Sequence, residues 1–164
     1  MPDYLIRNAV NADLPAIIEI YNASIPSRLA TADLEPISVA SRQDWFDRHT
    51  ATHPLWVMEK QEEIAGWLSF NDFYGRPAYH RTAELSIYVS PDYRRQGIGQ
   101  SLLEQAITQS PHLGLNTLLA MIFAHNRPSL QLFHKFKFQQ WGYLPKVAEL
   151  DGVERDLAIL GRRV

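Results

Sequence analysis

Apolar residues recur along this chain at two spacings, one typical of helices and one typical of strands. In residues 14–25 and 98–106 they fall three or four positions apart, which predicts amphipathic helices. In residues 82–89 they alternate with polar residues, which predicts a strand with Glu84 and Ser86 on its more polar face. The chain therefore mixes helices and strands.

Turn and breaker residues separate these patterns into an ordered series of elements. Strands are expected at residues 5–7, 55–59, 64–70, 82–89, 117–123, 139–147 and 154–160. Helices are expected at residues 14–25, 42–49, 97–109 and 127–136. Residues 26–41 form an irregular loop long enough to be functional, and Asp151-Gly152 is a hairpin turn. The series predicts one α/β domain, residues 1–164, with a mixed sheet and helices on both faces.

Composition and charge argue against several classes of partner and site. The apolar fraction of 46% and the charged fraction of 21% are ordinary for a globular domain with one core. The net charge of −2 offers no positive field, so we expect neither nucleic acid nor a membrane as a partner. The absence of cysteine excludes disulfides, thiolate nucleophiles and zinc–thiolate sites. No apolar segment approaches the roughly 20 residues that span a bilayer.

Three smaller observations complete this picture. The first eight residues lack a basic stretch followed by an apolar run, so we expect no signal peptide and a cytoplasmic location. The histidines show no metal-ligand spacing, so we expect no metal. Trp45, Trp56 and Trp67 are interpreted as core residues.

Residues 86–101 carry the most chemical information. A strand ends at Pro91, a turn with two arginines and two glycines follows, and an amphipathic helix begins. Glycines let the backbone approach a ligand, and the first turn of a helix has free N–H groups in a field that favours anions. Arg94 and Arg95 add positive charge, so the segment indicates a diphosphate site. The alternative is a tight turn with solvated arginines. Neither G-x-G-x-x-G nor G-x-x-x-x-G-K-[ST] is present.

The stretch Arg94-Arg95-Gln96-Gly97-Ile98-Gly99 resembles the pyrophosphate motif Q/R-x-x-G-x-G/A of the GCN5-related N-acetyltransferase (GNAT) superfamily. Within that superfamily, residues 13–22, 76–79 with 82–89, and 126–129 are similar to the phosphinothricin/methionine sulfoximine acetyltransferase branch. The resemblance spans residues 6–160. It implies an α/β (α+β) fold with a mixed, mostly antiparallel sheet of about six to seven strands, acetyl-CoA as cofactor, and a homodimer.

The resemblance also implies roles for particular residues. It places Ile87, Tyr88 and Val89 along the pantetheine arm through their backbone. It places the cofactor's phosphates and thiol end against Arg94, Arg95, Gln96, Gly97, Ile98, Gly99, Gln100, Ser101, Asn126, Ser129 and Lys135. It makes Glu84 the base. It also gives Pro77, Ala78 and Tyr79 as the loop that contacts the substrate, beside Glu84. Apart from the resemblance, an acceptor pocket could be lined by Tyr21, Arg28, Tyr74, Arg76 and Tyr79, where an arginine would suit a substrate carboxylate.

Three of these residues have plain structural alternatives. Glu84 is a sheet-face carboxylate that Arg81 could pair with. Asn126 could cap the following helix, since Pro128 lies two residues later, or could both cap and bind. Lys135 could be a solvated surface residue. As a base, Glu84 would take a proton from the amine, because only the neutral amine has a lone pair with which to attack.

The sequence departs from the family in two places. Phe133 stands where a tyrosine or histidine of the family would protonate the leaving thiolate, and phenylalanine cannot donate a proton. His134 is expected to face elsewhere, since one residue turns a helix by about 100°. Lys137 stands where the family has a helix-ending glycine in the left-handed conformation, at a cost of about 1 kcal/mol.

Three functions follow from the sequence as hypotheses. The first is acetylation of the amine of a small amino acid or analogue, such as phosphinothricin, methionine sulfoximine or methionine sulfone. The second is acetylation of another amine, such as a polyamine, an aminoglycoside or a protein N-terminus. The third is a CoA-binding regulator without turnover, which Phe133 makes conceivable.

Overall fold

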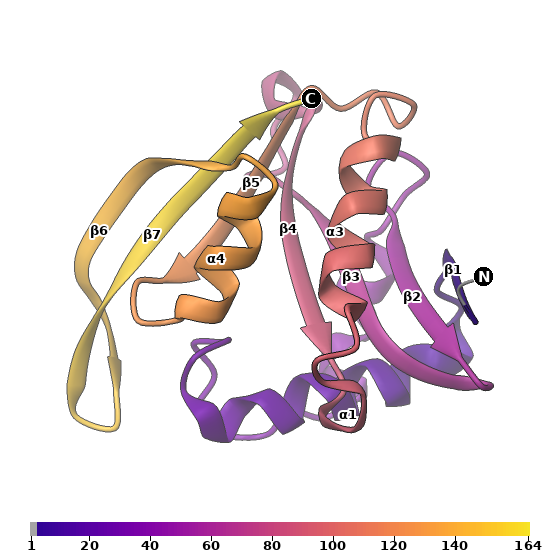
Figure 1. Cartoon of the computed structure of the whole chain (residues 1–164), viewed down its shortest axis with the longest axis horizontal. Coiled ribbons are helices and arrows are strands. Elements are labelled where there is room, and N and C mark those ends of the chain that lie inside the picture. The colour runs from indigo at the N-terminus through magenta and orange to yellow at the C-terminus, as the bar shows by residue number, and fades with distance from the viewer. Residues whose placement is uncertain (1–2) are drawn as a thin grey trace.

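The computed structural model describes residues 3–164, whose seven strands form one sheet in the order β1-β2-β3-β4-β5-β7-β6 (Figure 1). The strands are β1 (Tyr4–Asn8), β2 (Leu55–Lys60), β3 (Glu63–Asp72), β4 (Thr82–Val89), β5 (Thr117–Phe123), β6 (Gln139–Leu150) and β7 (Val153–Arg163). Only β4 and β5 run parallel, and every other neighbouring pair is antiparallel. The prediction of a mixed, mostly antiparallel sheet is confirmed.

Helices cover both faces of this sheet, as predicted. They are α1 (Leu14–Ser24), α2 (Gln43–Asp47), α3 (Ile98–Gln109) and α4 (Arg127–Lys135). Figure 1 shows α3 and α4 in front of the sheet and α1 across its other side. Leu68, Leu85, Leu102 and Leu103 belong to the core on the α3 face, and Trp56 is buried with them, as expected. A second core, on the α1 face, is built from Ile17, Ile18, Val57 and Trp67.

The side chains of β4 alternate as the sequence predicts. Ala83 and Leu85 are buried in the core beneath α3. Ser86 and Tyr88 face the α1 side, where they line a pocket. Because alternation has a period of two, Glu84 shares that second face. The polar face of β4 is thus turned toward α1 and the loop that follows it.

The predicted element bounds shift mainly at the ends. The first helix ends at Ser24, one residue before its predicted end, and residues Ile25–Ser27 form a 3-10 turn. Proline at position 26 has no N–H with which to continue the helix. The helix α2 is shorter than predicted, and β6 extends three residues further than predicted, to Leu150.

Two turns behave as their sequences indicate. Asp151 and Gly152 both have positive φ, 53° and 79°, and join β6 to β7 as a hairpin. Lys137 adopts φ 66° directly after α4, where the family's glycine was expected to be left-handed. Its N–H donates to the carbonyl oxygen of His134 over 2.9 Å and helps to close the helix.

The loop between α1 and α2 is irregular but tied down. The side chain of Asn22 pairs with the backbone of Ile37 twice, donating to its carbonyl and accepting from its N–H, each over 2.9 Å. These two hydrogen bonds anchor the middle of the loop to α1. No helix in residues 3–164 is long and apolar enough to cross a membrane.

Candidate active site

The sheet opens between its two parallel strands. Thr82, Ala83 and Glu84 of β4 pair with Thr117, Leu118 and Leu119 of β5, and the pairing then stops. Figure 1 shows the two strands diverging from that point toward the carboxyl end of β4. Residues 85–89 therefore have no strand partner on their β5 side. Backbone groups along this edge are available to an extended ligand, because strand edges carry unpaired N–H and C=O groups.

Glu84 lies where this opening begins. Its carboxylate makes no hydrogen bond or ion pair with any residue in the described range 3–164. Arg81 does not pair with it, since its Nε donates instead to the carbonyl oxygen of Gly114 over 3.2 Å. Burial raises the pKa of the Glu84 carboxyl above its usual range. The geometry therefore gives an unpartnered, partly desolvated carboxylate beside an open strand edge.

The turn after β4 leaves a run of backbone donors free. Arg95 and Gly97 both have positive φ, 60° and 77°, which bends the chain sharply before α3. No backbone N–H from residue 94 to residue 100 donates to an acceptor within residues 3–164, and the next N–H, of Ser101, bonds to the Gly97 carbonyl. The helix has no side-chain cap at this end. This arrangement suits an anion.

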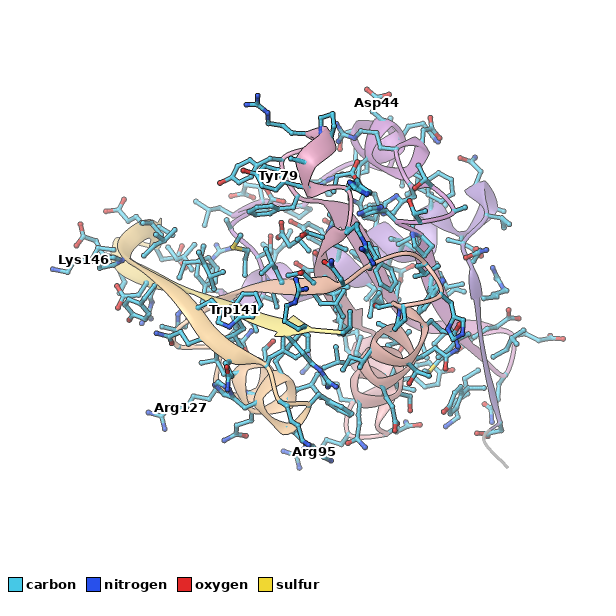
Figure 2. The ribbon with its side chains drawn as sticks, turned by 90° about the horizontal axis from the view of Figure 1, so that it is seen from above. Asp44, Tyr79, Arg95, Arg127, Trp141 and Lys146 are labelled. Carbon is cyan, nitrogen blue, oxygen red and sulfur yellow. The ribbon has the colours of Figure 1, made fainter. Side chains whose placement is uncertain are left out.

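Charged and polar side chains surround this turn. Arg94 and Arg95 are exposed, and Figure 2 shows Arg95 extending away from the ribbon. The ammonium of Lys135 on α4 donates to Oε1 of Gln100 on α3 over 2.8 Å, which places a third cation beside the free N–H groups. Gln96 accepts from Lys60 over 2.9 Å. The structure therefore brings together the residues predicted for a diphosphate, including Lys135.

The remaining predicted cofactor residues have structural partners. The side chain of Asn126 accepts from the N–H of Ser129 over 3.3 Å, so Asn126 caps α4. Its amide nitrogen donates to the carbonyl oxygen of Leu29 over 3.1 Å. Ser101 accepts from the hydroxyl of Tyr4 over 3.3 Å. The capping alternative for Asn126 is confirmed, and a ligand could still use its second amide hydrogen or the second lone pair of its oxygen.

The residues predicted to contact the amine do not all converge. Arg28 donates to the carboxylate of Asp151 over 2.8 Å and to the Leu34 carbonyl over 2.9 Å, so its guanidinium ties a loop to the β6–β7 hairpin. Arg76 precedes an exposed 3-10 turn made of Pro77, Ala78 and Tyr79. Figure 2 shows Tyr79 on this turn, at the opposite end of the molecule from Arg95.

The aromatic neighbours of that turn form an exposed group of their own. The ring of Tyr79 packs edge-on against Phe73, with centroids 5.2 Å apart, and Phe73 also packs against Tyr74. Tyr74 is 77% exposed. Of the residues predicted to contact the amine, Tyr21 is the one that lines the pocket below.

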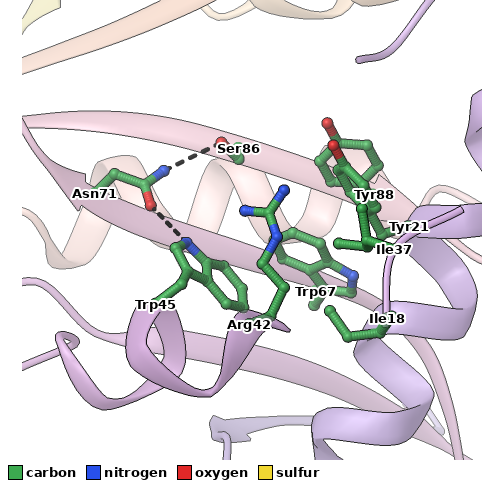
Figure 3. A pocket seen from close by; sticks show the side chains of 9 residues that line it. All are labelled: Ile18, Tyr21, Ile37, Arg42, Trp45, Trp67, Asn71, Ser86 and Tyr88. Atoms are coloured by element: carbon green, nitrogen blue, oxygen red, sulfur yellow. Dashed lines mark hydrogen bonds between the residues drawn. The ribbon is translucent and has the colours of Figure 1, made fainter. Parts of the chain in front are cut away.

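A pocket of about 280 Å³ lies on the Glu84 side of the sheet (Figure 3). Its walls come from α1, the loop after it, α2, β3 and β4. They are formed by Ile18, Tyr21, Ile37, Arg42, Trp45, Trp67, Asn71, Ser86 and Tyr88. The sequence interpretation gave no role to Arg42, Asn71 or Ser86. The prediction of Trp45 and Trp67 as core residues is confirmed, since Trp67 is buried in the core on the α1 face and Trp45 packs against it, and both also line the pocket. The sequence offers one signal for these residues. Arg42 directly follows the long irregular loop at residues 26–41, and the tryptophans Trp45 and Trp67 come after it.

Asn71 joins this pocket to the strand that bears Glu84. Its amide nitrogen donates to the Glu84 carbonyl over 3.3 Å and to Oγ of Ser86 over 3.1 Å. Its oxygen accepts from the indole of Trp45 over 3.1 Å (Figure 3). Ser86 lies two residues beyond Glu84 on the same face of β4. The pocket wall therefore begins at the side chain next to the Glu84 carboxylate on that face.

The expectation that His134 faces away from the surroundings of Phe133 is confirmed. Phe133 is 4% exposed and packs edge-on against Phe138, with centroids 4.9 Å apart, so it is a core residue. His134 Nδ1 is 3.1 Å from the carbonyl oxygen of Phe138, at the exposed end of α4. Neither residue supplies a proton donor to the opening between β4 and β5. Within residues 3–164, no group of three or more His, Asp or Glu side chains is arranged to hold a metal ion.

Known proteins resemble this chain in sequence over nearly its whole length. YwnH of Bacillus subtilis (strain 168), whose name assigns it to the phosphinothricin acetyltransferases, is 48% identical over 160 residues, 97% of this chain and 98% of YwnH. An L-methionine sulfoximine/L-methionine sulfone acetyltransferase of Pseudomonas aeruginosa is 33% identical over 157 residues, 94% of this chain and 91% of that protein.

Solved structures give the same result. A phosphinothricin acetyltransferase (Pat) from Sinorhizobium meliloti, in complex with acetyl-CoA, matches with a TM-score of 0.91 and 30% identity, over 99% of this chain and 89% of that chain. The model of the acetyltransferase (GNAT) family matches residues 14–138, and acetyl-CoA is the cofactor of this family. The chain therefore belongs to the acetyltransferase (GNAT) family and is an N-acetyltransferase.

Proposed function

We propose that this chain transfers the acetyl group of acetyl-CoA to the amine of a small amino acid or analogue, of the phosphinothricin or methionine sulfoximine type. The observation that carries the proposal is the position of Glu84. Its unpartnered carboxylate stands where β4 leaves β5, between a pocket and an open strand edge. The relatives named above support the class of acceptor.

The chain has the features that acetyl-CoA requires. The free N–H groups of residues 94–100 would hold its diphosphate, and the guanidinium groups of Arg94 and Arg95 would balance the charge. Lys135 lies beside the same N–H groups. The unpaired edge at Ile87, Tyr88 and Val89 would hold the pantetheine arm, which runs into the opening between the strands. The thioester would then lie near Glu84.

The reaction then requires the protein to position the amine against the thioester and to provide one proton acceptor. The lone pair of the neutral amine attacks the thioester carbonyl carbon, so a C–N bond forms and the C–S bond breaks. Glu84 accepts the proton that leaves the nitrogen, directly or through one water. A free α-amino group has a pKa near 8, so a carboxylate with a raised pKa can drive this step at neutral pH. Because Phe133 cannot donate, the leaving thiolate takes its proton from water.

An amine panel with detection of free CoA thiol tests the proposal. We expect thiol release with phosphinothricin, methionine sulfoximine or methionine sulfone, and slower release with a polyamine, an aminoglycoside or a peptide N-terminus. Faster release with one of the latter would move the acceptor to that class. Binding of acetyl-CoA without thiol release for any amine would leave a cofactor-binding regulator.

We also propose that the protein is a homodimer, as its family resemblance implies. The β6–β7 hairpin supports this, because it exposes Trp141, Tyr143 and Val147, whose exposed fractions are 47%, 44% and 54%. Light scattering on the purified protein tests the proposal, and a mass of one chain at micromolar concentration would contradict it.

A further inference from the structure

The pocket beside Glu84 contains one cation whose hydrogen-bonding capacity is largely unused. Arg42 lies on the pocket wall, and Nη2 of its guanidinium is 3.2 Å from the carboxylate of Asp33. This is its one side-chain hydrogen bond within residues 3–164, although a guanidinium has five N–H donors. The group sits 5.3 Å from the ring centre of Tyr21, on its face. Figure 3 shows it pointing into the pocket between Trp45 and Tyr88.

Asp33 does not fully occupy this arginine. The same carboxylate accepts a hydrogen bond from the hydroxyl of Tyr21, so its charge is shared between two donors. The distance of 3.2 Å is longer than the 2.7–2.9 Å typical of a charge-assisted bond. Arg42 therefore keeps several donors for another anion.

The other lining groups carry no charge that competes with Arg42. Among the described residues that line the pocket there is no aspartate or glutamate. Burial raises the pKa of Tyr88 and contributes most to the raised pKa of Tyr21, so both phenols stay neutral. The oxygen of Ser86 accepts from Asn71, which leaves the serine hydrogen free to donate to a ligand. The pocket thus combines aromatic walls with one cation and a hydroxyl donor.

The position of Arg42 decides which part of an acceptor it can reach. Tyr21, the residue under Arg42, packs against Tyr88, with ring centroids 5.1 Å apart. Tyr88 lies four residues beyond Glu84 on the same face, roughly 13 Å along the strand. An α-carboxylate is two bonds from its own amine and would stay near Glu84. A group that reaches Arg42 must stand several bonds away from the reacting nitrogen.

From this geometry we infer that Arg42 binds an anionic group at the far end of the acceptor's side chain. The inference rests on the proposed function and narrows it: the preferred acceptor is an amino acid whose side chain ends in a carboxylate, phosphinate or similar oxyanion. Arg42 then determines specificity, by affinity for the acceptor, while Glu84 acts at the amine.

Two acceptors with the same amine end separate this role from others. Phosphinothricin and methionine sulfone share an α-amine and an α-carboxylate, but the side chain of the first ends in a phosphinate anion and that of the second in a neutral sulfone. Loss of a charge-assisted contact predicts that Arg42→Gln raises KM for phosphinothricin by roughly 10- to 100-fold, with kcat within about 2-fold. KM for methionine sulfone should change by less than about 3-fold.

Three further variants serve as controls. Arg48→Gln removes a nearby positive charge outside this pocket and should leave both KM values unchanged. Asp33→Asn removes the partner of Arg42, and it should not raise KM for phosphinothricin. Arg42→Lys keeps the charge and should recover part of the affinity for phosphinothricin, which provides a second measurement if Arg42→Gln unfolds. Thermal melting checks that each variant is folded.

The outcomes are distinct. Equal changes in both KM values for Arg42→Gln, or the same loss in Asp33→Asn, would overturn the inference and assign Arg42 to the loop's structure. Absence of thiol release from the unmodified protein with both amines would instead overturn the proposed function, and this inference with it. A selective rise in KM for phosphinothricin, partly reversed in Arg42→Lys, supports the role of Arg42.

Discussion

Two strand–turn–helix units lie side by side in this molecule and differ in whether their polar groups have hydrogen-bond partners. In the first, β4 leads to α3, and neither the N–H groups of residues 94–100 nor the Glu84 carboxylate has a partner within the described residues 3–164. In the second, β5 leads to α4, and the side chain of Asn126 caps the helix. His134 and Lys137 hydrogen-bond at the far end of α4.

The difference separates a unit built for a ligand from one built for stability. Free donors at the start of a helix cost stability unless water or a ligand takes them, and a side-chain cap recovers about 1 kcal/mol. The β4–α3 unit forgoes that gain, and a glycine stands at its cap position. Substitutions in the first unit should therefore change binding or turnover. Those in the second should change the free energy of unfolding.

The largest effect is expected from Glu84→Gln. The amide has nearly the same shape but cannot accept the amine proton, so kcat should fall by roughly 10²- to 10³-fold. Acetyl-CoA affinity and the melting temperature should stay close to those of the unmodified protein. Glu104→Gln, an exposed position on α3, is the matched control and should keep full turnover. Unchanged kcat in Glu84→Gln would reject Glu84 as the base.

The dependence of kcat on pH should reveal the protonation of Glu84. A protonated carboxyl cannot accept a proton, so kcat falls as pH decreases through the pKa of Glu84. Because burial raises that pKa, the decline should begin at a higher pH than an exposed glutamate would give. In Glu84→Gln the decline of kcat that protonation of Glu84 causes should disappear. The decline that protonation of the amine causes should remain. An unchanged acidic limb in the variant would assign it to another group.

Next in size is the effect of Gly99→Ala on acetyl-CoA. A Cβ at this position would lie 3.5 Å from Leu132 and 3.7 Å from Val89, which are ordinary contacts, so the fold has room for it. Alanine is also the better helix former by roughly 1 kcal/mol, so the melting temperature should rise. A ligand that approaches the backbone closely would meet the methyl group. Calorimetry should then show affinity reduced by about 10-fold or more, as for the loss of one or two hydrogen bonds.

A rise in melting temperature with unchanged acetyl-CoA affinity would mean that the diphosphate does not lie over Gly99. The matched control is a second substitution to alanine on the same helix, Gln105→Ala, at an exposed position away from the turn. It should leave affinity unchanged.

The fold could be predicted further from the sequence than the site could. Strand β4 was predicted with its observed bounds, because alternation over eight residues fixes both the element and its faces. The turn before α3 was also found, because glycines and arginines in sequence are adjacent in space. The pocket was not, because its residues come from separate segments, among them Arg42 and Trp45 around the start of α2, Asn71 on β3 and Ser86 on β4, which only the tertiary fold brings together. Arg28 shows the same limit, since its partner Asp151 lies 123 residues away.

A smaller effect is expected in the second unit, from Asn126→Ala. The variant loses the cap of α4 and the bond to the Leu29 carbonyl, so stability should fall by about 1 to 2 kcal/mol. Chemical denaturation measures this change. Acetyl-CoA affinity should change less than in Gly99→Ala. A large loss of affinity would show that Asn126 also binds the cofactor and that the two units share the ligand.

The smallest effect is expected from Lys137→Gly. Lys137 has φ 66°, a conformation that costs a residue with a side chain about 1 kcal/mol and costs glycine almost nothing. The variant should therefore be more stable, with a melting temperature higher by roughly 2–4 °C for a chain of this size. Lys137→Ala keeps the Cβ and should show no such gain. Turnover should be unchanged in both variants, because this residue closes α4 and lies outside the β4–α3 unit. An equal gain in both would trace the effect to the lost lysine charge and not to the backbone.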